Sequence, residues 1–237
     1  MAGARRPRAP GDGGVDPASV AARLAAVRDR IEDAGRGPGG VTVVAVTKGF
    51  GPEAVRAALE AGLSDIGENY AQEMLAKLAS VPAEVRWHFL GGIQRNKLSR
   101  LAPHVHLWHG LDREEEALAL GRLRPGAGVL VEVRSELGPR FAPEARAGVS
   151  EEEVAGLVSV ASAAGLSVKG LMTLGPRGAP PDEVARHFRS VARLALDLGL
   201  PELSMGMSAD FELAVAEGAT IIRLGQALFG PRPLKRG

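Results

Sequence analysis

The sequence predicts an α/β fold, a single (β/α)8 TIM barrel with an extra N-terminal helix. Eight short apolar runs alternate with stretches of helical period, which is the pattern of parallel βα units. The chain has 237 residues, and barrels of this kind commonly take about 200–250 residues as one domain. Hydrophobic residues make up 45% of the chain and aromatic residues only 4%, so we expect a core built mainly from Ala, Val, Leu and Ile.

The extra helix is predicted at 17–34. Asp16 and Pro17 offer an N-cap followed by a proline suited to the first helical position. Apolar residues then recur at helical steps on one face, and they are Val20, Leu24, Val27 and Ile31. Glycines from Gly35 onward end the helix.

The eight units follow in order. We predict strands at 41–47, 63–67, 86–90, 105–109, 127–133, 167–173, 202–205 and 220–224. We predict helices at 52–61, 69–79, 94–101, 112–122, 151–164, 182–198 and 209–217. Gly225 lies too close to the end of the sequence for the last unit to supply a full outer helix, so the helix at 17–34 is expected to cover that gap. We expect a disordered tail at 1–15, one domain at 16–232 and a second tail at 233–237.

Charge and composition exclude several classes of protein. The formal net charge of +1 gives no field that would make nucleic acid the main partner. The absence of Cys excludes disulfides, thiolate metal sites and cysteine nucleophiles. The sequence has no apolar run of about 18 residues, and its Arg-rich start is followed by Gly and Pro, so we expect neither a membrane span nor a signal peptide. We therefore expect a cytoplasmic protein.

Lys48 is the first candidate for chemistry. Alternation along the strand at 41–47 puts Val44, Val46 and Lys48 on one face, so the amine is expected at the barrel mouth, where active sites of this architecture collect. Desolvation lowers the pKa of an amine, and a neutral amine can attack a carbonyl to form a Schiff base. The alternative is that Lys48 extends into solvent before Gly49.

A second candidate site follows the last two strands. Ser208 comes after the seventh strand, and Gly225 and Gln226 come after the eighth. Barrels often bind phosphate on these two loops through free backbone N–H groups and hydroxyls. The alternative is an ordinary helix cap and an ordinary turn. With Lys48 across the same mouth, these residues indicate a ligand that is an aldehyde and carries a phosphate.

Arg223 shares a strand face with Ile221 and Gly225 and is expected to point inward. A guanidinium donates hydrogen bonds but does not accept a proton. Facing the ring nitrogen of a pyridine cofactor, it would keep that nitrogen unprotonated and make the ring a poorer electron sink. The alternative is an ion pair with an acid such as Glu217.

Other polar residues near the predicted strand ends leave alternatives open. His88 is either a core histidine or one that touches a ligand. Asn69 follows the second strand and either hydrogen-bonds a ligand or caps the next helix. The segment Gln94-Arg95-Asn96-Lys97 is either an anion site or a solvated helix start.

The histidines between 104 and 109 do not predict a metal site. His104 and His106 share one strand face while His109 points to the other, and no Cys completes a set of ligands. We expect His109 to line the mouth and expect no metal.

Six motifs occur together and in order. They are Val44-Ala45-Val46-Thr47-Lys48, Gly67-Glu68-Asn69-Tyr70-Ala71-Gln72-Glu73, Trp87-His88-Phe89-Leu90-Gly91, Gln94-Arg95-Asn96-Lys97, Gly170-Leu171-Met172-Thr173 and Leu203-Ser204-Met205-Gly206-Met207-Ser208. This set resembles the YggS/PROSC family of pyridoxal 5′-phosphate homeostasis proteins from about residue 17 to residue 232.

The resemblance implies a barrel like the N-terminal domain of bacterial alanine racemase, with pyridoxal 5′-phosphate, a vitamin B6 cofactor, held as a Schiff base on Lys48. It implies phosphate contacts from Ser208, Gly225 and Gln226, with Arg223 facing the pyridine nitrogen. Asn69 and His88 match positions near the cofactor.

Three positions depart from the family pattern. Gln226 stands where many relatives have Thr or Ser, so backbone or amide groups must replace any hydroxyl contact there. Arg134 stands where Asn is common, and Leu174-Gly175-Pro176 alters the turn after the sixth strand.

The resemblance implies a carrier and regulator in cofactor and amino-acid balance, without robust catalysis. A racemase needs two bases on opposite faces of the ring, and this chain has one Tyr, Tyr70. The alternatives are a weak racemase or lyase that uses the same Schiff base, and a lysine aldolase without cofactor. As partners we expect the cofactor and apo-enzymes that accept it, neither nucleic acid nor membrane, and a monomeric state.

Overall fold

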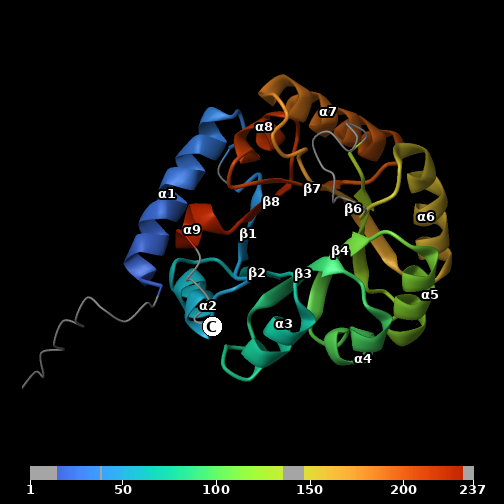
Figure 1. Cartoon of the computed structure of the whole chain (residues 1–237), viewed down its shortest axis with the longest axis horizontal. Helices are drawn as coiled ribbons and strands as arrows, with labels where there is room; N and C mark the ends of the chain where they lie inside the picture. The colour runs from blue at the N-terminus through green and yellow to red at the C-terminus, as the bar shows by residue number, and fades with distance from the viewer. Residues whose placement is uncertain (1–14, 38, 136–146, 232–237) are drawn as a thin grey trace, which may run out of the picture.

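Eight parallel strands close into a barrel in which each strand pairs with its neighbour in the sequence and β8 pairs with β1 (Figure 1). The computed structural model describes residues 15–37, 39–135 and 147–231. The strands are β1 (Thr42–Val46), β2 (Asp65–Glu68), β3 (Arg86–Gly92), β4 (Val105–Leu111), β5 (Gly128–Val133), β6 (Ser167–Thr173), β7 (Glu202–Met207) and β8 (Ile221–Leu224). Each overlaps a predicted strand, so the predicted α/β barrel is confirmed. The predicted tails at 1–15 and 233–237 lie outside the described residues, apart from Val15.

Helices surround the barrel and follow the strands in alternation. They are α1 (Pro17–Asp33), α2 (Pro52–Glu60), α3 (Ala71–Leu78), the 3-10 turn η1 (Arg95–Lys97) with α4 (Leu98–Leu101), α5 (Glu114–Leu123), α6 (Glu151–Ala163), α7 (Pro181–Asp197), α8 (Phe211–Ala216) and α9 (Gln226–Phe229). Among the described residues, none of these helices combines the length and the apolar character needed to cross a bilayer.

Three strands, β3, β4 and β7, run two residues further than the sequence predicts. The pairing register shifts between Phe89 and Gly92 of β3, between Trp108 and Leu111 of β4, and near the end of β7. Strand alternation cannot be followed through such irregularities, because an extra residue breaks the period of two. The extensions lie at the carboxyl ends of the strands, where they shape the rim of the barrel.

The predicted role of α1 is confirmed. Its N-terminus is capped as expected, because the Asp16 carboxylate accepts a hydrogen bond from the Ser19 N–H at 2.9 Å. Figure 1 shows α1 lying alongside α9 and α8. Arg23 Nη1 donates to the Leu228 carbonyl at 3.2 Å, and the Arg30 guanidinium lies 4.5 Å from the centre of the Phe211 ring. The N-terminal helix thus closes the outer layer beside the short α9.

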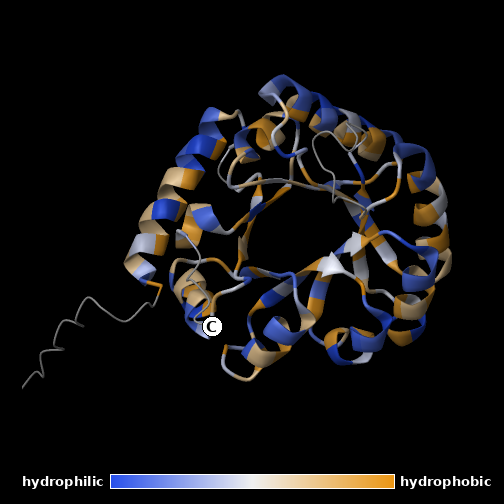
Figure 2. Ribbon diagram, in the orientation of Figure 1, coloured by the Kyte–Doolittle hydropathy of each residue, from blue (hydrophilic) through white to orange (hydrophobic). Residues whose placement is uncertain are grey.

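The core has two layers. A small cluster fills the barrel interior, consisting of Val44, Leu107, Leu130, Met172 and Ile221. A much larger cluster lies between the strands and the helices. Figure 2 shows the same pattern, with polar residues on the outward helix faces and apolar residues along the strands. Val44 in the inner cluster confirms that the predicted face of β1 points into the barrel.

Replacing Gly170 by alanine is expected to destabilise the barrel. Gly170 pairs with Glu202 across β6 and β7, and an added Cβ would lie 1.8 Å from the Glu202 carbonyl oxygen. Because that oxygen belongs to the backbone of a paired strand, we expect a loss of about 2 kcal/mol in the free energy of unfolding. Urea unfolding measures it. Gly156→Ala on the exposed face of α6, where no atom lies within 4 Å of the added Cβ, is the control, and an equal loss there would contradict the argument.

Candidate functional site

The carboxyl ends of all eight strands meet at one rim of the barrel, because the strands are parallel. Lys48 follows β1 at this rim and is half-buried, while Asn69 follows β2. Ser208 follows β7, and Gly225 and Gln226 follow β8. Since β8 pairs with β1, the loop that carries Gly225 lies next to the end of the Lys48 strand.

The loops after β7 and β8 are bonded to one another. The Ser208 hydroxyl accepts a hydrogen bond from the Ala227 N–H at 3.1 Å, at the start of α9. Ser208 does not cap α8, because α8 begins at Phe211 with Asp210 at its N-cap position. Asp210 Oδ1 instead accepts from the Met207 N–H at 2.6 Å and shapes the turn after β7. A hydroxyl and the first N–H groups of a short helix therefore lie together at the rim.

Arg223 points into the barrel, as predicted. Its Nη1 donates to the carbonyl oxygen and to the hydroxyl of Ser204, both at 2.6 Å, and its Nη2 donates to the Thr173 carbonyl at 2.8 Å. Burial lowers the pKa of Arg223 to about 10, against the raising effect of Glu132 and Asp210. The guanidinium therefore stays charged at neutral pH.

The alternative pairing of Arg223 with Glu217 is wrong. Glu217 lies in the outer layer, where its Oε2 accepts from Arg189 Nε at 2.9 Å. The two guanidinium groups occupy different layers, because Arg223 is on the inner face of a strand and Arg189 is on α7.

A relay of hydrogen bonds crosses the barrel interior and ends at Arg223. Asp65 Oδ1 and His88 Nε2 are 2.9 Å apart, and His88 Nδ1 lies 2.9 Å from His109 Nε2. His109 Nδ1 in turn lies 2.9 Å from the hydroxyl of Ser204, which also accepts from Arg223. Both ring nitrogens of His88 are thus engaged within the protein. The sequence alone does not predict this role for Asp65 or Ser204.

The relay has a negative end at Asp65 and a neutral histidine, His109, beside Ser204. Burial raises the pKa of Asp65, but hydrogen bonds from His88 and Arg86 outweigh burial and hold that pKa below its usual range. Burial, together with the charges of His88 and Arg223, lowers the pKa of His109 well below its usual value. His109 is therefore neutral at physiological pH, with one ring nitrogen donating and the other accepting.

Glu132 lies near the charged end of Arg223. Its side chain is buried, and burial together with the charge of Asp112 raises its pKa to about 7. The charge of Arg223 acts in the opposite direction. Among the described residues, no three His, Asp or Glu side chains gather as ligands of a metal ion would.

A cavity of about 510 Å³ opens beside the rim near β2, β3 and β4. Its lining includes Asn69, Tyr70, Gln94, Lys97 and Arg113. Asn69 does not cap α3, since Tyr70 occupies the N-cap position, so the cap alternative for Asn69 is wrong. The cavity brings Asn69 together with two residues of the segment predicted as an anion site or a helix start.

Known proteins of the same fold and length resemble this chain closely. Residues 15–233 match the family model described as alanine racemase, N-terminal domain. The pyridoxal phosphate homeostasis protein of Pseudomonas aeruginosa is 41% identical over 223 residues, which cover 91% of this chain and 94% of that protein. This chain belongs to the pyridoxal phosphate homeostasis protein family. The predicted family resemblance is confirmed.

Solved structures agree with this membership in the homeostasis protein family. PipY of Synechococcus elongatus, solved with PLP bound, is 33% identical with a TM-score of 0.76, covering 89% of this chain and all of PipY. The crystal structure of an unknown protein from Bifidobacterium adolescentis is 30% identical with a TM-score of 0.80, covering 90% of this chain and 95% of that one.

The structure places Gln226 and Arg134, two of the residues expected to depart from the pattern of the homeostasis protein family. Gln226 is the first residue of α9 and is exposed, so its backbone N–H is part of the rim while its side chain faces outward. Arg134 follows β5, and its Nη1 donates to the Gly148 carbonyl at 2.8 Å. Arg134 thus joins two segments of the chain beyond the end of β5.

Proposed function

We propose that this protein holds pyridoxal 5′-phosphate as a Schiff base on Lys48 and acts inside the cell as a carrier in the homeostasis of that cofactor and in amino-acid balance. Membership of the family supports the cofactor, as does the PipY structure with PLP bound. The detail of the proposal rests on the arrangement of this chain's own residues at the rim.

The donor set at the rim suits the three parts of the cofactor. Lys48 offers an amine for the aldehyde, and Ser208 with the N–H groups of Gly225 and Gln226 offers an anion site for the phosphate. Arg223 offers a permanent donor for the aromatic nitrogen. The observation that carries the proposal is the position of Lys48 just after β1, whose end lies next to the β8 loop. The β8 loop is itself bonded to the β7 loop through Ser208.

When bound, the cofactor supplies an electrophilic aldehyde and an electron-withdrawing ring. The Lys48 amine, in its unprotonated form, would bond to the aldehyde carbon, and the carbonyl oxygen would leave as water with both amine protons, so atoms and charge balance. Arg223, held by Ser204 and Thr173, keeps a positive charge where a ring nitrogen would otherwise gain a proton. An unprotonated ring stabilises a carbanion poorly, which favours a carrier over a catalyst.

Lysine substitution tests the covalent site. Lys48→Ala is expected to abolish the visible absorbance of the bound cofactor, because no other amine is proposed to reach the aldehyde. Borohydride reduction of the wild-type holoprotein, followed by peptide mass mapping, is expected to place the pyridoxyl group on Lys48. Lys169→Ala, on an exposed lysine of β6, is the control. An adduct on another lysine, or unchanged absorbance in Lys48→Ala, would show that the proposed site is wrong.

Two measurements distinguish a cofactor carrier from a catalyst. A carrier transfers its bound cofactor to an apo-enzyme even when free cofactor is trapped. A weak racemase or lyase changes the enantiomer ratio or the amount of an amino acid incubated with the holoprotein. One observation favours the racemase or lyase. Tyr70, the single tyrosine, lines the cavity beside Asn69, and a tyrosine is a group that can act as a base. Substantial turnover would replace the carrier proposal.

A further inference from the structure

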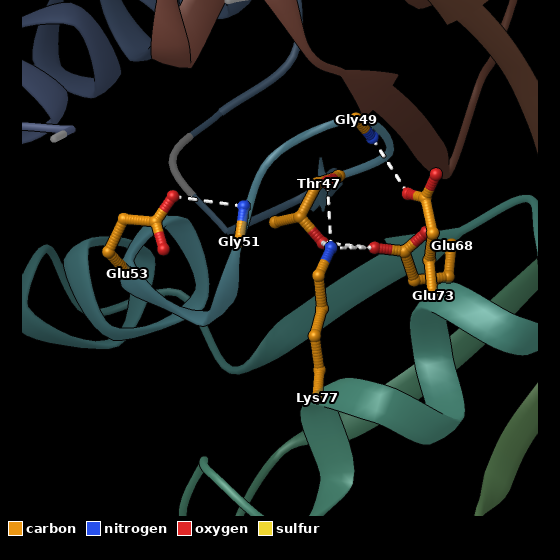
Figure 3. Close-up of polar contacts among 7 residues, drawn as sticks. All are labelled: Thr47, Gly49, Gly51, Glu53, Glu68, Glu73 and Lys77. Atoms are coloured by element: carbon orange, nitrogen blue, oxygen red, sulfur yellow. Dashed lines mark hydrogen bonds and ion pairs between the residues drawn. The ribbon is translucent and has the colours of Figure 1, made fainter. Parts of the chain in front are cut away.

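Two side chains of α3 hold the backbone on either side of Lys48 (Figure 3). Lys77 Nζ donates to the carbonyl oxygen of Thr47 at 2.8 Å, and Glu73 Oε2 accepts from the N–H of Gly49 at 2.8 Å. Glu73 and Lys77 are four residues apart, so they lie on the same face of the helix. One helix face therefore contacts both neighbours of Lys48.

Lys77 is held in place by a buried network. Its side chain is 4% exposed and forms an ion pair with Glu68, whose side chain is 0% exposed. The Thr47 hydroxyl donates to Glu68 Oε1 at 2.7 Å and also lies 3.2 Å from Lys77 Nζ. Burial raises the pKa of Glu68, against the lowering effect of the Lys77 charge. Among the described residues, no hydrogen bond reaches the second oxygen of Glu68.

A buried ion pair of this kind contributes little to the free energy of unfolding. Removing two charges from water costs several kcal/mol per ion, and a well-packed apolar pair often does as well. The contacts here converge on one residue, Thr47, which Lys77 holds through its carbonyl and Glu68 through its hydroxyl. The geometry therefore indicates that the network fixes the position of the strand end rather than adding general stability.

The chain needs such fixing just after Lys48. Gly49 has a φ of +79°, in the left-handed region that glycine enters freely, and it is exposed. The turn is closed by the Phe50 N–H, which donates to the Thr47 carbonyl at 3.0 Å. Glu73 supplies a contact from outside this turn, and it restrains the residue whose freedom would otherwise let the Lys48 backbone move.

We propose that Glu73, Lys77 and Glu68 form an α3 clamp that positions Lys48 for its bond to the cofactor aldehyde. This inference rests on the proposed function. The three residues do not touch the cofactor in this proposal, so they are positioning residues. Misplacing a reacting group by about 1 Å can cost about a hundredfold in reaction. The clamp therefore affects the covalent bond and leaves the contacts from β7 and β8 unchanged.

Two ligands separate the covalent bond from the other contacts. Pyridoxal phosphate carries the aldehyde, and pyridoxine phosphate carries an alcohol in its place on the same ring with the same phosphate. For wild-type protein we expect the aldehyde to bind more tightly, and we define the preference as the ratio of the two dissociation constants. In Glu73→Ala the preference is expected to fall about tenfold, while alcohol binding stays near the wild-type value.

Two further variants test whether a loss of preference comes from misfolding and whether a conservative substitution restores the preference. Lys77→Met alone leaves Glu68 as an unpaired buried acid, so the double variant Glu68→Met/Lys77→Met removes both charges at once. It is expected to bind the alcohol normally and to lose the preference as Glu73→Ala does. Glu73→Gln keeps an oxygen that accepts from Gly49 and is expected to restore most of the preference. A purely structural effect would weaken both ligands together.

Glu53 offers a matched control. Its Oε1 accepts from the Gly51 N–H at 2.9 Å, which is the same kind of contact on the same loop but from α2 (Figure 3). Glu53→Ala is expected to keep the wild-type preference. Amide exchange adds a readout without cofactor, since the Gly49 N–H of the apoprotein is expected to exchange faster in Glu73→Ala and at the wild-type rate in Glu53→Ala.

The outcomes distinguish the clamp from the proposed function. A wild-type preference that survives in both Glu73→Ala and the double variant overturns the clamp alone. Equal loss of aldehyde and alcohol binding also overturns it. If the wild-type protein shows no preference and no adduct on Lys48, the proposed function itself is wrong.

Discussion

Arg223→Leu is expected to lower the free energy of unfolding of the apoprotein by about 3 kcal/mol. The substitution leaves the Ser204 carbonyl, the Ser204 hydroxyl and the Thr173 carbonyl without their shared donor in the barrel interior. A buried polar group that loses its partner costs about 1–3 kcal/mol. The loss is partly offset, because the buried guanidinium itself was costly to remove from water.

Urea unfolding of the apoprotein measures this effect, and Arg189→Leu is its matched control. Arg189 also forms a two-point contact, with Glu217, but it lies on the outer surface. Exposed ion pairs contribute about 0–1 kcal/mol, so the control is expected to change stability little. Losses of similar size in the two variants would contradict the view that the inner network holds the barrel together.

Glu132→Gln is expected to change the pH dependence of stability. Burial raises the pKa of folded Glu132 to about 7 from an ordinary 4.5. The folded state therefore retains a proton that the unfolded state releases, and this contribution to stability is full below about pH 4.5 and is lost as the pH rises through about 7. A shift of about 2.5 units, from 4.5 to 7, corresponds to about 3 kcal/mol.

The comparison of wild type with Glu132→Gln isolates this one group. His109 acts with the opposite sign, because its lowered pKa makes the folded state more stable as the pH rises toward the ordinary histidine value. Both proteins contain His109, so its effect cancels in the difference. Relative to wild type, the variant is expected to be about 3 kcal/mol more stable near pH 8 than near pH 5. A difference independent of pH would mean that folded Glu132 titrates normally.

Much of the fold follows from local patterns. The apolar stripe of α1, its Asp16 cap and the short β-branched runs of the strands are properties of a few neighbouring residues, so they can be read along the chain. The inward direction of Val44 and Arg223 follows from alternation within one strand. The ends of the strands were predicted less accurately, because the register shifts in β3, β4 and β7 depend on the neighbouring strand.

The candidate site also has a part that local sequence predicts and a part that it does not. Lys48, Ser208 and Gly225 could be placed at one rim because parallel strands all end on the same side. The relay could not be predicted, since His109 and Ser204 are 95 residues apart in the sequence and meet only when the barrel closes. The sequence shows only that Lys77 follows Glu73 by four residues, and this spacing does not reveal that both side chains reach the backbone beside Lys48. Local sequence determined which residues face inward and which polar residues follow the strand ends. Barrel closure and the packing of α3 decided which polar groups share hydrogen bonds, because such contacts depend on distance in space.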